Sequence, residues 1–347
     1  MRIGLLTTSF PRRAGDYAGS FVGDRVARLV ADGHDVDVIA AGDAGFSEGH
    51  HLTVTRLFAA AGLFYGTGAP ERLEAGGAWF GAAAFFAALA AATRARAGAW
   101  DVIESHWLVP CAAAASTVAP DRPRRAWAHS GDVSLLERLP LGRTLARRLA
   151  RDGTDLRFVS ADLRARFGRL VGGPVGTVEP IPLADGAFAP RSGADAALRR
   201  RLCLMLPTVL SVGRLVPIKG HTRLIHGASL AAAKGHTAEV VILGDGPERE
   251  RLAGLAGRLG VPLRLPGFVP RAEVAAWMSA ADLMVLPSIP LPNGRSEGAP
   301  TVLREAAAVG IPAHAISDPA EISRAIAAIA PRAHSAPGES NQCVMDV

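Results

Sequence analysis

The chain has 347 residues, of which 49% are hydrophobic and 20% are charged, and its formal net charge is +6. This length is enough for two domains of ordinary size, each with a packed core. The positive charge favours anionic partners such as nucleotide phosphates or lipid headgroups, whereas no zinc-finger, RNP-like or basic-zipper pattern points to nucleic acid. The three cysteines lie far apart without a CxxC pair, which fits a reducing cytoplasm rather than a disulfide scaffold or a metal site.

The start of the chain predicts a parallel sheet. Residues 2–8 form an apolar run typical of a buried strand, 21–32 have a helical pattern, and 35–41 form the next strand. A strand–helix–strand unit of this kind implies a right-handed crossover. The loop after the first strand contains Gly15 and Gly19 but no G-x-G-x-x-G, which argues against a nicotinamide dinucleotide enzyme. Polar residues follow soon after the first residues, so we expect no signal peptide.

Residues 75–92 are an uninterrupted run of alanines, glycines and aromatic residues. As a helix rising about 1.5 Å per residue, the run would reach roughly 27 Å, which is close to the thickness of a bilayer core. We nevertheless predict a helix packed on the sheet, because alanine and glycine supply little insertion energy and the next strand begins near Asp101. A membrane span is the alternative.

Two histidines follow predicted strands, in the segments 105–110 and 128–132. In open α/β sheets, ligands bind at the carboxyl ends of the strands. A single histidine is more often structural than catalytic, and that interpretation stays open for His106. His129 has Gly131 and Asp132 beside it, which favours a functional role.

A basic helix is predicted over 140–151. Its leucines and its arginines fall on separate stripes, at positions 141, 145 and 149 and at positions 143, 147 and 151. Two interpretations remain: a helix on the sheet with a solvated basic face, or a helix that docks on anionic lipid.

The Pro/Gly-rich segment 172–192 predicts a linker, and strands follow it at 208–212, 239–243, 261–265 and 281–288. We therefore expect one domain over 1–182, a second over 183–330 and a disordered tail over 331–347.

The stretch Glu297-Gly-Ala-Pro-Thr-Val-Leu-Arg-Glu305 carries two carboxylates eight residues apart, before and inside a predicted helix. Pro300 suits the first helical position, and Gly310 ends the helix. The free N–H groups of a helix N-terminus favour an anion such as phosphate. Glu305 could accept hydrogen bonds from a diol such as ribose, although two solvated surface acids are an equally simple explanation.

These motifs together resemble the retaining glycosyltransferases of family 4 (glycosyl transferases group 1). The E-x7-E spacing of 297–305 is the family signature, Val212-Gly-Arg-Leu215 with Lys219-Gly220 resembles its phosphate-binding segment, Ile242-Leu-Gly-Asp-Gly-Pro247 resembles its GxGP turn, and Leu265-Pro-Gly-Phe-Val269 resembles the segment beside the base. The resemblance implies the GT-B fold, an α/β architecture of two Rossmann-like domains facing each other across a cleft.

The resemblance also implies roles for individual residues. The catalytic positions would be His129, Glu297, Arg214 and Lys219. The donor-binding positions would be Gly19, Arg214, Lys219, Gly244, Gly246, Phe268, Gly298 and Glu305, with Asp132 helping to orient the site. No metal and no cofactor are expected, because the nucleotide-diphosphate sugar is itself the substrate.

The implied activity is transfer of a sugar, with retention, to a saccharide or lipid-linked acceptor in surface polysaccharide or glycolipid synthesis. The expected location is the cytoplasm, with peripheral attachment to an anionic membrane as a further option. After Gly310 the family continues with a Gly-Gly loop, further strands and a helix crossing onto the first domain, and much of this is not found in the remaining residues. A catalytically impaired homologue that binds nucleotide or a partner enzyme is therefore the alternative, and a nucleotide-sugar epimerase of the same fold ranks third.

Overall fold

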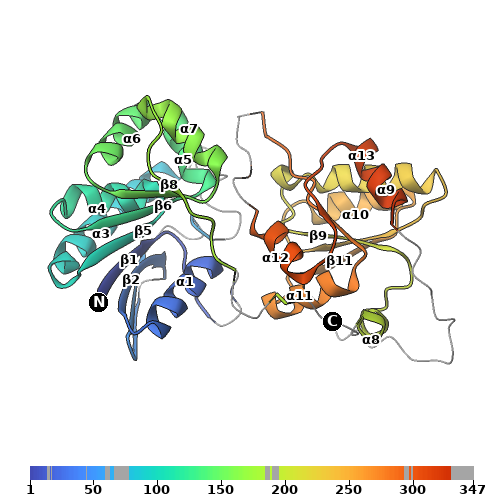
Figure 1. Cartoon of the computed structure of the whole chain (residues 1–347), viewed down its shortest axis with the longest axis horizontal. Helices are drawn as coiled ribbons and strands as arrows, with labels where there is room; N and C mark the ends of the chain where they lie inside the picture. The colour runs from blue at the N-terminus through green and yellow to red at the C-terminus, as the bar shows by residue number, and fades with distance from the viewer. Residues whose placement is uncertain are drawn as a thin grey trace. The chain divides into compact units, whose positions relative to one another are not determined.

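The structure is a computed structural model that describes residues 1–13, 16, 18–43, 45–58, 63–65, 78–183, 188–189, 195–292, 297 and 300–329. It divides into two compact units, Met1–Pro182 and Leu183–Val347 (Figure 1), and each is described by itself. The predicted tail 331–347 and the glycines at 15 and 298 lie outside the described residues.

Unit 1 contains an eight-stranded sheet, as far as the described residues show, in the order β3-β4-β2-β1-β5-β6-β7-β8. The β3 strand is antiparallel to β4, and every other neighbouring pair is parallel. The strands are β1 (Arg2–Thr7), β2 (Asp35–Gly42), β3 (Gly45–Gly49), β4 (Leu52–Phe58), β5 (Val102–His106), β6 (Arg124–Ala128), β7 (Asp155–Phe158) and β8 (Thr177–Val178). The predicted parallel sheet is confirmed, although the short edge strands β3 and β8 were not predicted.

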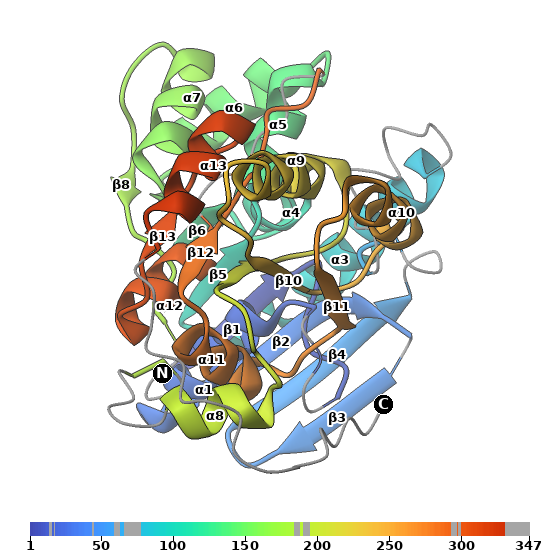
Figure 2. The same cartoon turned by 90° about the vertical axis from the view of Figure 1, so that its right-hand side faces the viewer.

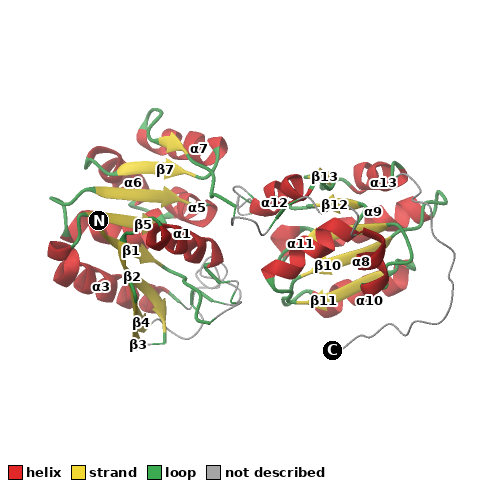
Figure 3. Ribbon diagram, turned by 60° about the horizontal axis from the view of Figure 1, so that its bottom comes forward, coloured by secondary structure: helices red, strands yellow, loops and turns green. Residues whose placement is uncertain are grey.

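Helices lie on both faces of this sheet (Figure 3). On one face, α1 (Ser20–Ala31) packs its apolar stripe against β1, β2 and β4. On the other face, α3 (Trp79–Arg96) and α4 (Ala113–Val118) pack against β1, β2 and β5. The helices α5 (Ser130–Arg138) and α6 (Gly142–Arg151) follow β6 in the chain, and α7 (Ala161–Val171) follows β7. These three helices pack against one another.

The alanine-rich run forms α3, which buries Phe85 and Leu89 in the core of unit 1. None of the helices in the described part of the chain combines the length and the apolar character that a membrane span needs. Cys111 is a buried free thiol.

Unit 2 contains a second parallel sheet, with five strands among the described residues, in the order β11-β10-β9-β12-β13. The strands are β9 (Thr208–Val212), β10 (Glu239–Leu243), β11 (Leu263–Gly267), β12 (Leu283–Val285) and β13 (Ala313–His314). The bounds of β9 and β10 are those predicted, because both are apolar runs with breakers at each end.

Two helical layers enclose the sheet of unit 2, as Figure 2 shows. The helices α9 (His221–Ala232), α10 (Arg249–Leu259) and α13 (Pro319–Ala327) share one core with the sheet. On the opposite face, α8 (Asp195–Arg201), α11 (Arg271–Ala280) and α12 (Thr301–Val309) share the other core. Pro300 is the N-cap of α12 rather than its first helical residue, a correction of one position, and Gly310 ends the helix in the left-handed conformation as expected.

The contact between α9 and α13 depends on a glycine, which generates a stability prediction. A Cβ on Gly227 would lie 2.5 Å from Ile322 Cγ2, and Ile322 is fully buried. We expect Gly227→Ala to lower the free energy of unfolding of the protein by about 1–3 kcal/mol, as overpacking does. The matched control is Gly257→Ala in α10, where a Cβ meets nothing within 4 Å. That change should be neutral or stabilising by up to about 1 kcal/mol. Urea denaturation checks both, and equal midpoints for the two variants would contradict the packing argument.

Candidate functional site

The strand order of unit 2 reverses at β9, which has β10 on one side and β12 on the other. Ligands of parallel α/β sheets bind beyond the carboxyl ends of the strands at such a reversal. The loop after β9 contains Arg214 and Lys219, the loop after β10 contains Gly244 and Gly246, and the segment after β12 contains Glu297. The topology therefore brings the predicted residues to one edge of one sheet.

Interlocked turns hold the loop that carries Arg214. The backbone N–H groups of Gly213 and Leu215 donate to the carbonyls of Leu243 and Asp245, both at 2.9 Å. Gly244 has φ +137°, and a Cβ there would lie 2.1 Å from the Gly213 carbonyl oxygen. A Cβ on Gly246 would lie 2.5 Å from the Leu215 carbonyl oxygen. Glycine is required at both positions because the two turns approach each other closely.

Lys219 forms an ion pair with Glu297, and Ser288 Oγ donates a hydrogen bond to the other carboxylate oxygen. The stem of Lys219 passes over Gly213, at 3.1 Å from the position of a Cβ there. Gly220 packs directly against the loop after β12, because a Cβ added at Gly220 would lie 2.1 Å from the Pro287 carbonyl oxygen. The structure thus brings together a predicted phosphate-binding lysine and the first glutamate of the E-x7-E pair.

Glu305 lies in α12 and is buried, at 8% exposed. Arg271, at the start of α11, donates to its Oε1 at 2.9 Å. The same guanidinium lies 5.5 Å from the centre of the Phe188 ring. The predicted ribose-binding acid therefore has an arginine partner within unit 2 that the sequence did not suggest, because 34 residues separate the two.

Phe268 follows β11 and is 47% exposed. Gly298 lies outside the described residues, so its donor-binding role stays a prediction. Arg214 is half-buried in the loop after β9.

In unit 1 the strand order reverses at β1, between β2 and β5. His129 follows β6 and is the N-cap of α5. Its ring is 5% exposed and lies among aromatic rings, 4.5 Å from Trp107 and 4.9 Å from Phe21 between centroids. Its Nε2 lies 3.4 Å from Nδ1 of His106, so the structure brings the two histidines together. Burial holds the pKa of His129 well below its ordinary value, and the nearby His106 lowers it further.

Asp132 ties two loops of unit 1 together. Its carboxylate accepts a hydrogen bond of 2.6 Å from the N–H of Leu108, after β5, and one of 2.9 Å from the N–H of Val133. Burial raises the pKa of Asp132 to about 7, although backbone hydrogen bonds act in the opposite direction. Asp132 thus fixes the loop after β5 relative to the start of α5.

Gly19 is the N-cap of α1 and has φ +70°. A Cβ there would lie 2.3 Å from the carbonyl oxygen of Ser9. Packing of the chain against itself therefore explains why glycine is needed at this position. The contact of Gly19 with a ligand stays a prediction.

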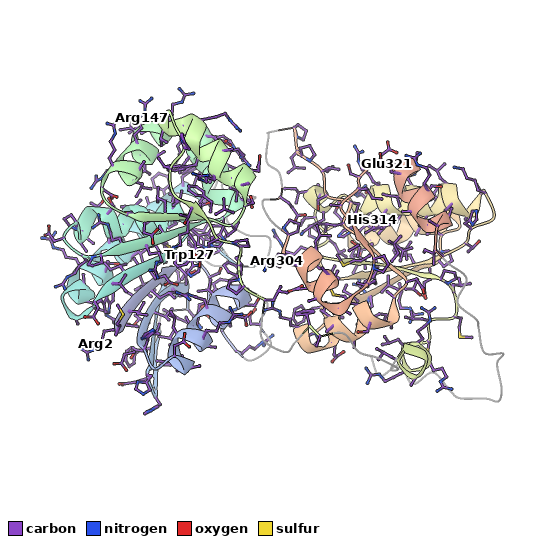
Figure 4. The ribbon with its side chains drawn as sticks, in the orientation of Figure 1. Arg2, Trp127, Arg147, Arg304, His314 and Glu321 are labelled. Carbon is purple, nitrogen blue, oxygen red and sulfur yellow. The ribbon has the colours of Figure 1, made fainter. Side chains whose placement is uncertain are left out.

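A cluster of charged side chains surrounds Trp127 of β6, a residue that Figure 4 labels. Three guanidiniums lie over its ring at 5.2–5.8 Å from the centroid, from Arg25, Arg125 and Arg157. Glu104, buried on β5, accepts hydrogen bonds from Arg25 at 2.8 and 3.0 Å. This cluster was not predicted from the sequence, although a glutamate inside an apolar strand is a signal of a buried acid with a partner.

No group of three or more His, Cys, Asp or Glu side chains within the described residues is placed to hold a metal ion.

The known proteins that resemble this chain in sequence agree in type, since those described below are glycosyltransferases. The sequence profile of the family described as glycosyl transferases group 1 matches residues 203–326. A Mycobacterium tuberculosis protein named GDP-mannose-dependent alpha-(1-6)-phosphatidylinositol monomannoside mannosyltransferase is 31% identical over 338 residues, covering 90% of this chain and 79% of that protein. A putative teichuronic acid biosynthesis glycosyltransferase of Bacillus subtilis is 30% identical over 217 residues, covering 61% of this chain and 52% of the relative.

Solved structures give the same fold. The Anabaena protein HepE, in complex with UDP and glucose, matches with a TM-score of 0.66 and 20% identity, over 94% of this chain and 89% of that one. A trehalose-phosphate synthase of Burkholderia vietnamiensis matches with a TM-score of 0.70 and 15% identity over the same shares. The chain has the α/β GT-B fold with two Rossmann-like domains.

The position of Asp132 generates a prediction about stability and its pH dependence. Asp132→Ala would leave the buried N–H of Leu108 without an acceptor, and we expect the free energy of unfolding to fall by about 1–3 kcal/mol. Asp132→Asn keeps an acceptor oxygen and should cost less. Because the folded pKa of about 7 lies above the ordinary value of 3.8, the native state binds more protons between these values. The wild-type stability minus that of Asp132→Asn should therefore fall as pH rises from about 4 to 7. A difference that rises or stays flat in urea denaturation across this range would contradict the assignment.

Proposed function

The chain belongs to the glycosyl transferases group 1 family, and from that membership we propose that it transfers a sugar from a nucleotide-diphosphate donor to a saccharide or lipid-linked acceptor, with retention at the transferred sugar. The observation that carries the proposal is the Lys219–Glu297 pair beside the Arg214 loop, at the strand-order reversal of unit 2. Retention rests on the resemblance of 297–305 to the E-x7-E signature.

The proposed chemistry begins with the leaving group. When the bond between sugar and diphosphate breaks, negative charge develops on the phosphate oxygens. Arg214 and Lys219 would stabilise that charge, and the N-terminus of α12 would add its dipole. No metal ion has a role in this proposal, because these fixed cations supply the positive charge.

The remaining residues take the rest of the donor. Glu305 would accept the ribose hydroxyls in place of Arg271, and Phe268 would meet the base. His129 in unit 1 would hydrogen-bond to a hydroxyl of the transferred sugar, and Glu297 would lie near that sugar. A lipid-linked acceptor is supported by the name of the mycobacterial relative, which specifies a phosphatidylinositol monomannoside.

The alternative is a homologue that binds nucleotide without turnover. It is favoured by one observation: Lys219 and Glu305 already have charged partners, Glu297 and Arg271, within the chain. A nucleotide that binds tightly but is neither hydrolysed nor used for transfer would select this alternative.

The first experiment identifies the donor and then tests the two cations. A thermal-shift screen should include GDP-mannose and UDP-glucose, since a ligand at a hundred times its Kd stabilises by about 2.7 kcal/mol. With the donor so found, Arg214→Ala and Lys219→Ala should each slow transfer about a hundredfold or more, because one lost donor of this kind costs about 2.7–4 kcal/mol. Lys234→Ala, in the exposed turn that follows α9, is the control and should be unchanged. Near-normal turnover in folded Arg214→Ala or Lys219→Ala would refute the assignment.

We also propose that α6 attaches unit 1 to an anionic membrane. Arg143, Arg147 and Arg151 are exposed, and Leu141 just before them is 74% exposed. Figure 4 shows Arg147 pointing away from the sheet. Leu149, from the predicted leucine stripe, is buried and therefore holds the helix on unit 1.

Changing these three arginines to glutamate should abolish sedimentation with vesicles rich in anionic lipid, because each basic residue contributes about 1 kcal/mol near such a surface. The matched control changes three exposed arginines on helices of unit 2, Arg201, Arg258 and Arg324, to glutamate and alters the net charge equally. Equal sedimentation of the two triple variants would disprove a specific role for α6.

A further inference from the structure

Ser288 follows β12 and is a second donor to Glu297, beside Lys219. Its hydroxyl donates a hydrogen bond to one carboxylate oxygen of Glu297, while the ammonium group of Lys219 pairs with the other oxygen. Within the part of the chain that the structure describes, these are the two side chains that donate to this carboxylate. The proposed function uses Lys219 and Glu297 but gives Ser288 no role.

Hydrogen bonds fix the backbone on both sides of Ser288. The N–H of Leu286 donates to the carbonyl of His314, the last residue of β13, at 2.9 Å. The N–H of Ile289 donates to the carbonyl of Ile218, in the turn that carries Lys219, at 2.9 Å. Ser288 lies between these two bonds, so its hydroxyl projects from a backbone that the second sheet and the loop after β9 hold in place.

The two donors to Glu297 differ in charge and in freedom to move. The ammonium group of Lys219 stands on a flexible four-carbon stem, whereas the hydroxyl of Ser288 is one carbon away from the fixed backbone. Lys219 Nζ lies 3.4 Å from the position of a Cβ on Gly213, beside the Arg214 loop. A phosphate group bound at that loop would therefore compete with Glu297 for Lys219, and the stem allows Lys219 to move.

The movement of Lys219 toward a diphosphate takes one of the two donors away from Glu297. A partly buried carboxylate that loses its hydrogen bonds is costly, so it would turn toward another partner or toward water. The hydroxyl of Ser288 stays in place, because the bonds that hold its backbone involve no ligand. Since this hydroxyl is neutral, it leaves the negative charge of Glu297 available to the positive charge that develops on a sugar as its bond to the leaving group breaks.

We propose that Ser288 is a positioning residue, which holds the carboxylate of Glu297 in one orientation after Lys219 has moved to the diphosphate of the donor. The benefit for transfer rests on the proposed function, whereas the arrangement of Ser288, Glu297 and Lys219 rests on unit 2 alone. Loss of the hydroxyl should therefore disturb the surroundings of Lys219 in the ligand-free protein. It should also slow transfer without an equal loss of donor binding.

The first test is an NMR measurement on the ligand-free protein. The chain contains two lysines, Lys219 and Lys234, so lysine labelled with ¹³C at Cε gives one signal for each, and Lys234→Arg assigns them. Because Ser288→Ala leaves one carboxylate oxygen of Glu297 without its donor, we expect the carboxylate to turn and the Lys219 signal to shift. Ser288→Thr keeps the hydroxyl and should keep the wild-type signal. An unchanged Lys219 signal in Ser288→Ala would overturn the proposal.

Two comparisons test whether the effect passes through Glu297. The matched control is Ser279→Ala, which removes another partly buried hydroxyl of unit 2, one that donates to the carbonyl of Ala275 within α11 at 2.8 Å. It should not shift the Lys219 signal. In Glu297→Ala, Lys219 has lost its partner, so the further change Ser288→Ala should move the signal no more. A shift as large as that of Ser288→Ala in either comparison would overturn the proposal.

Kinetics with the identified donor test the consequence for transfer. Ser288→Ala should lower kcat by about tenfold or more with a smaller change in the donor KM, as expected when a group is misplaced for the transition state. Ser288→Thr should restore most of kcat, and Ser279→Ala should leave both constants unchanged. A wild-type kcat in Ser288→Ala, or an equal loss in Ser288→Thr, would overturn the positioning role. Full activity in Glu297→Ala would instead defeat the role of Glu297 in the proposed function, and the NMR result separates the two failures.

Discussion

The ion pair between Lys219 and Glu297 joins the loop after β9 to the segment that leads into α12, and the arrangement of the candidate donor site in unit 2 depends on it. Neither side chain is more than 19% exposed, so solvent screens the attraction less than at an open surface. Backbone contacts set the geometry of the pair. Gly220 packs on Pro287, and Ile289 donates to the carbonyl of Ile218 at 2.9 Å, so the two loops are held together before any ligand arrives.

A nucleotide sugar that binds to this site must displace charged groups of the chain itself. Lys219 and Glu305 each have a partner of opposite charge, Glu297 and Arg271. A diphosphate that approaches Lys219 competes with a carboxylate, and a ribose that approaches Glu305 competes with a guanidinium. These contacts keep partly buried charges paired when no ligand is bound, which avoids the large cost of an isolated buried charge. The selectivity of the proposed site would then arise from ligands that can replace both partners together.

Much of the fold could be predicted from the sequence, because the strands that form the middle of each sheet are apolar runs bounded by breakers. β1, β9 and β10 are of this kind. The edge strand β3 could not be found, since all five of its residues are exposed and carry no apolar alternation. The loop residues of the candidate site were found because their motifs are local in sequence. Contacts such as Arg271–Glu305 and His106–Glu104 could not be predicted from the sequence. They depend on which strands and helices become neighbours in the fold and on the directions in which the side chains point.

The charged cluster around Trp127 has a consequence for mutational tolerance. Its acids are shared: Asp155 accepts from Arg125 at 3.2 Å and from Arg157 at 2.9 Å, and Glu104 faces both Arg25 and Arg125. Loss of Arg125 would therefore still leave each of these acids beside another guanidinium. Loss of an acid, in contrast, would leave several positive charges crowded over one indole ring. Sequence drift in this region should for that reason be asymmetric, with arginines exchanged more freely than the acids that they surround.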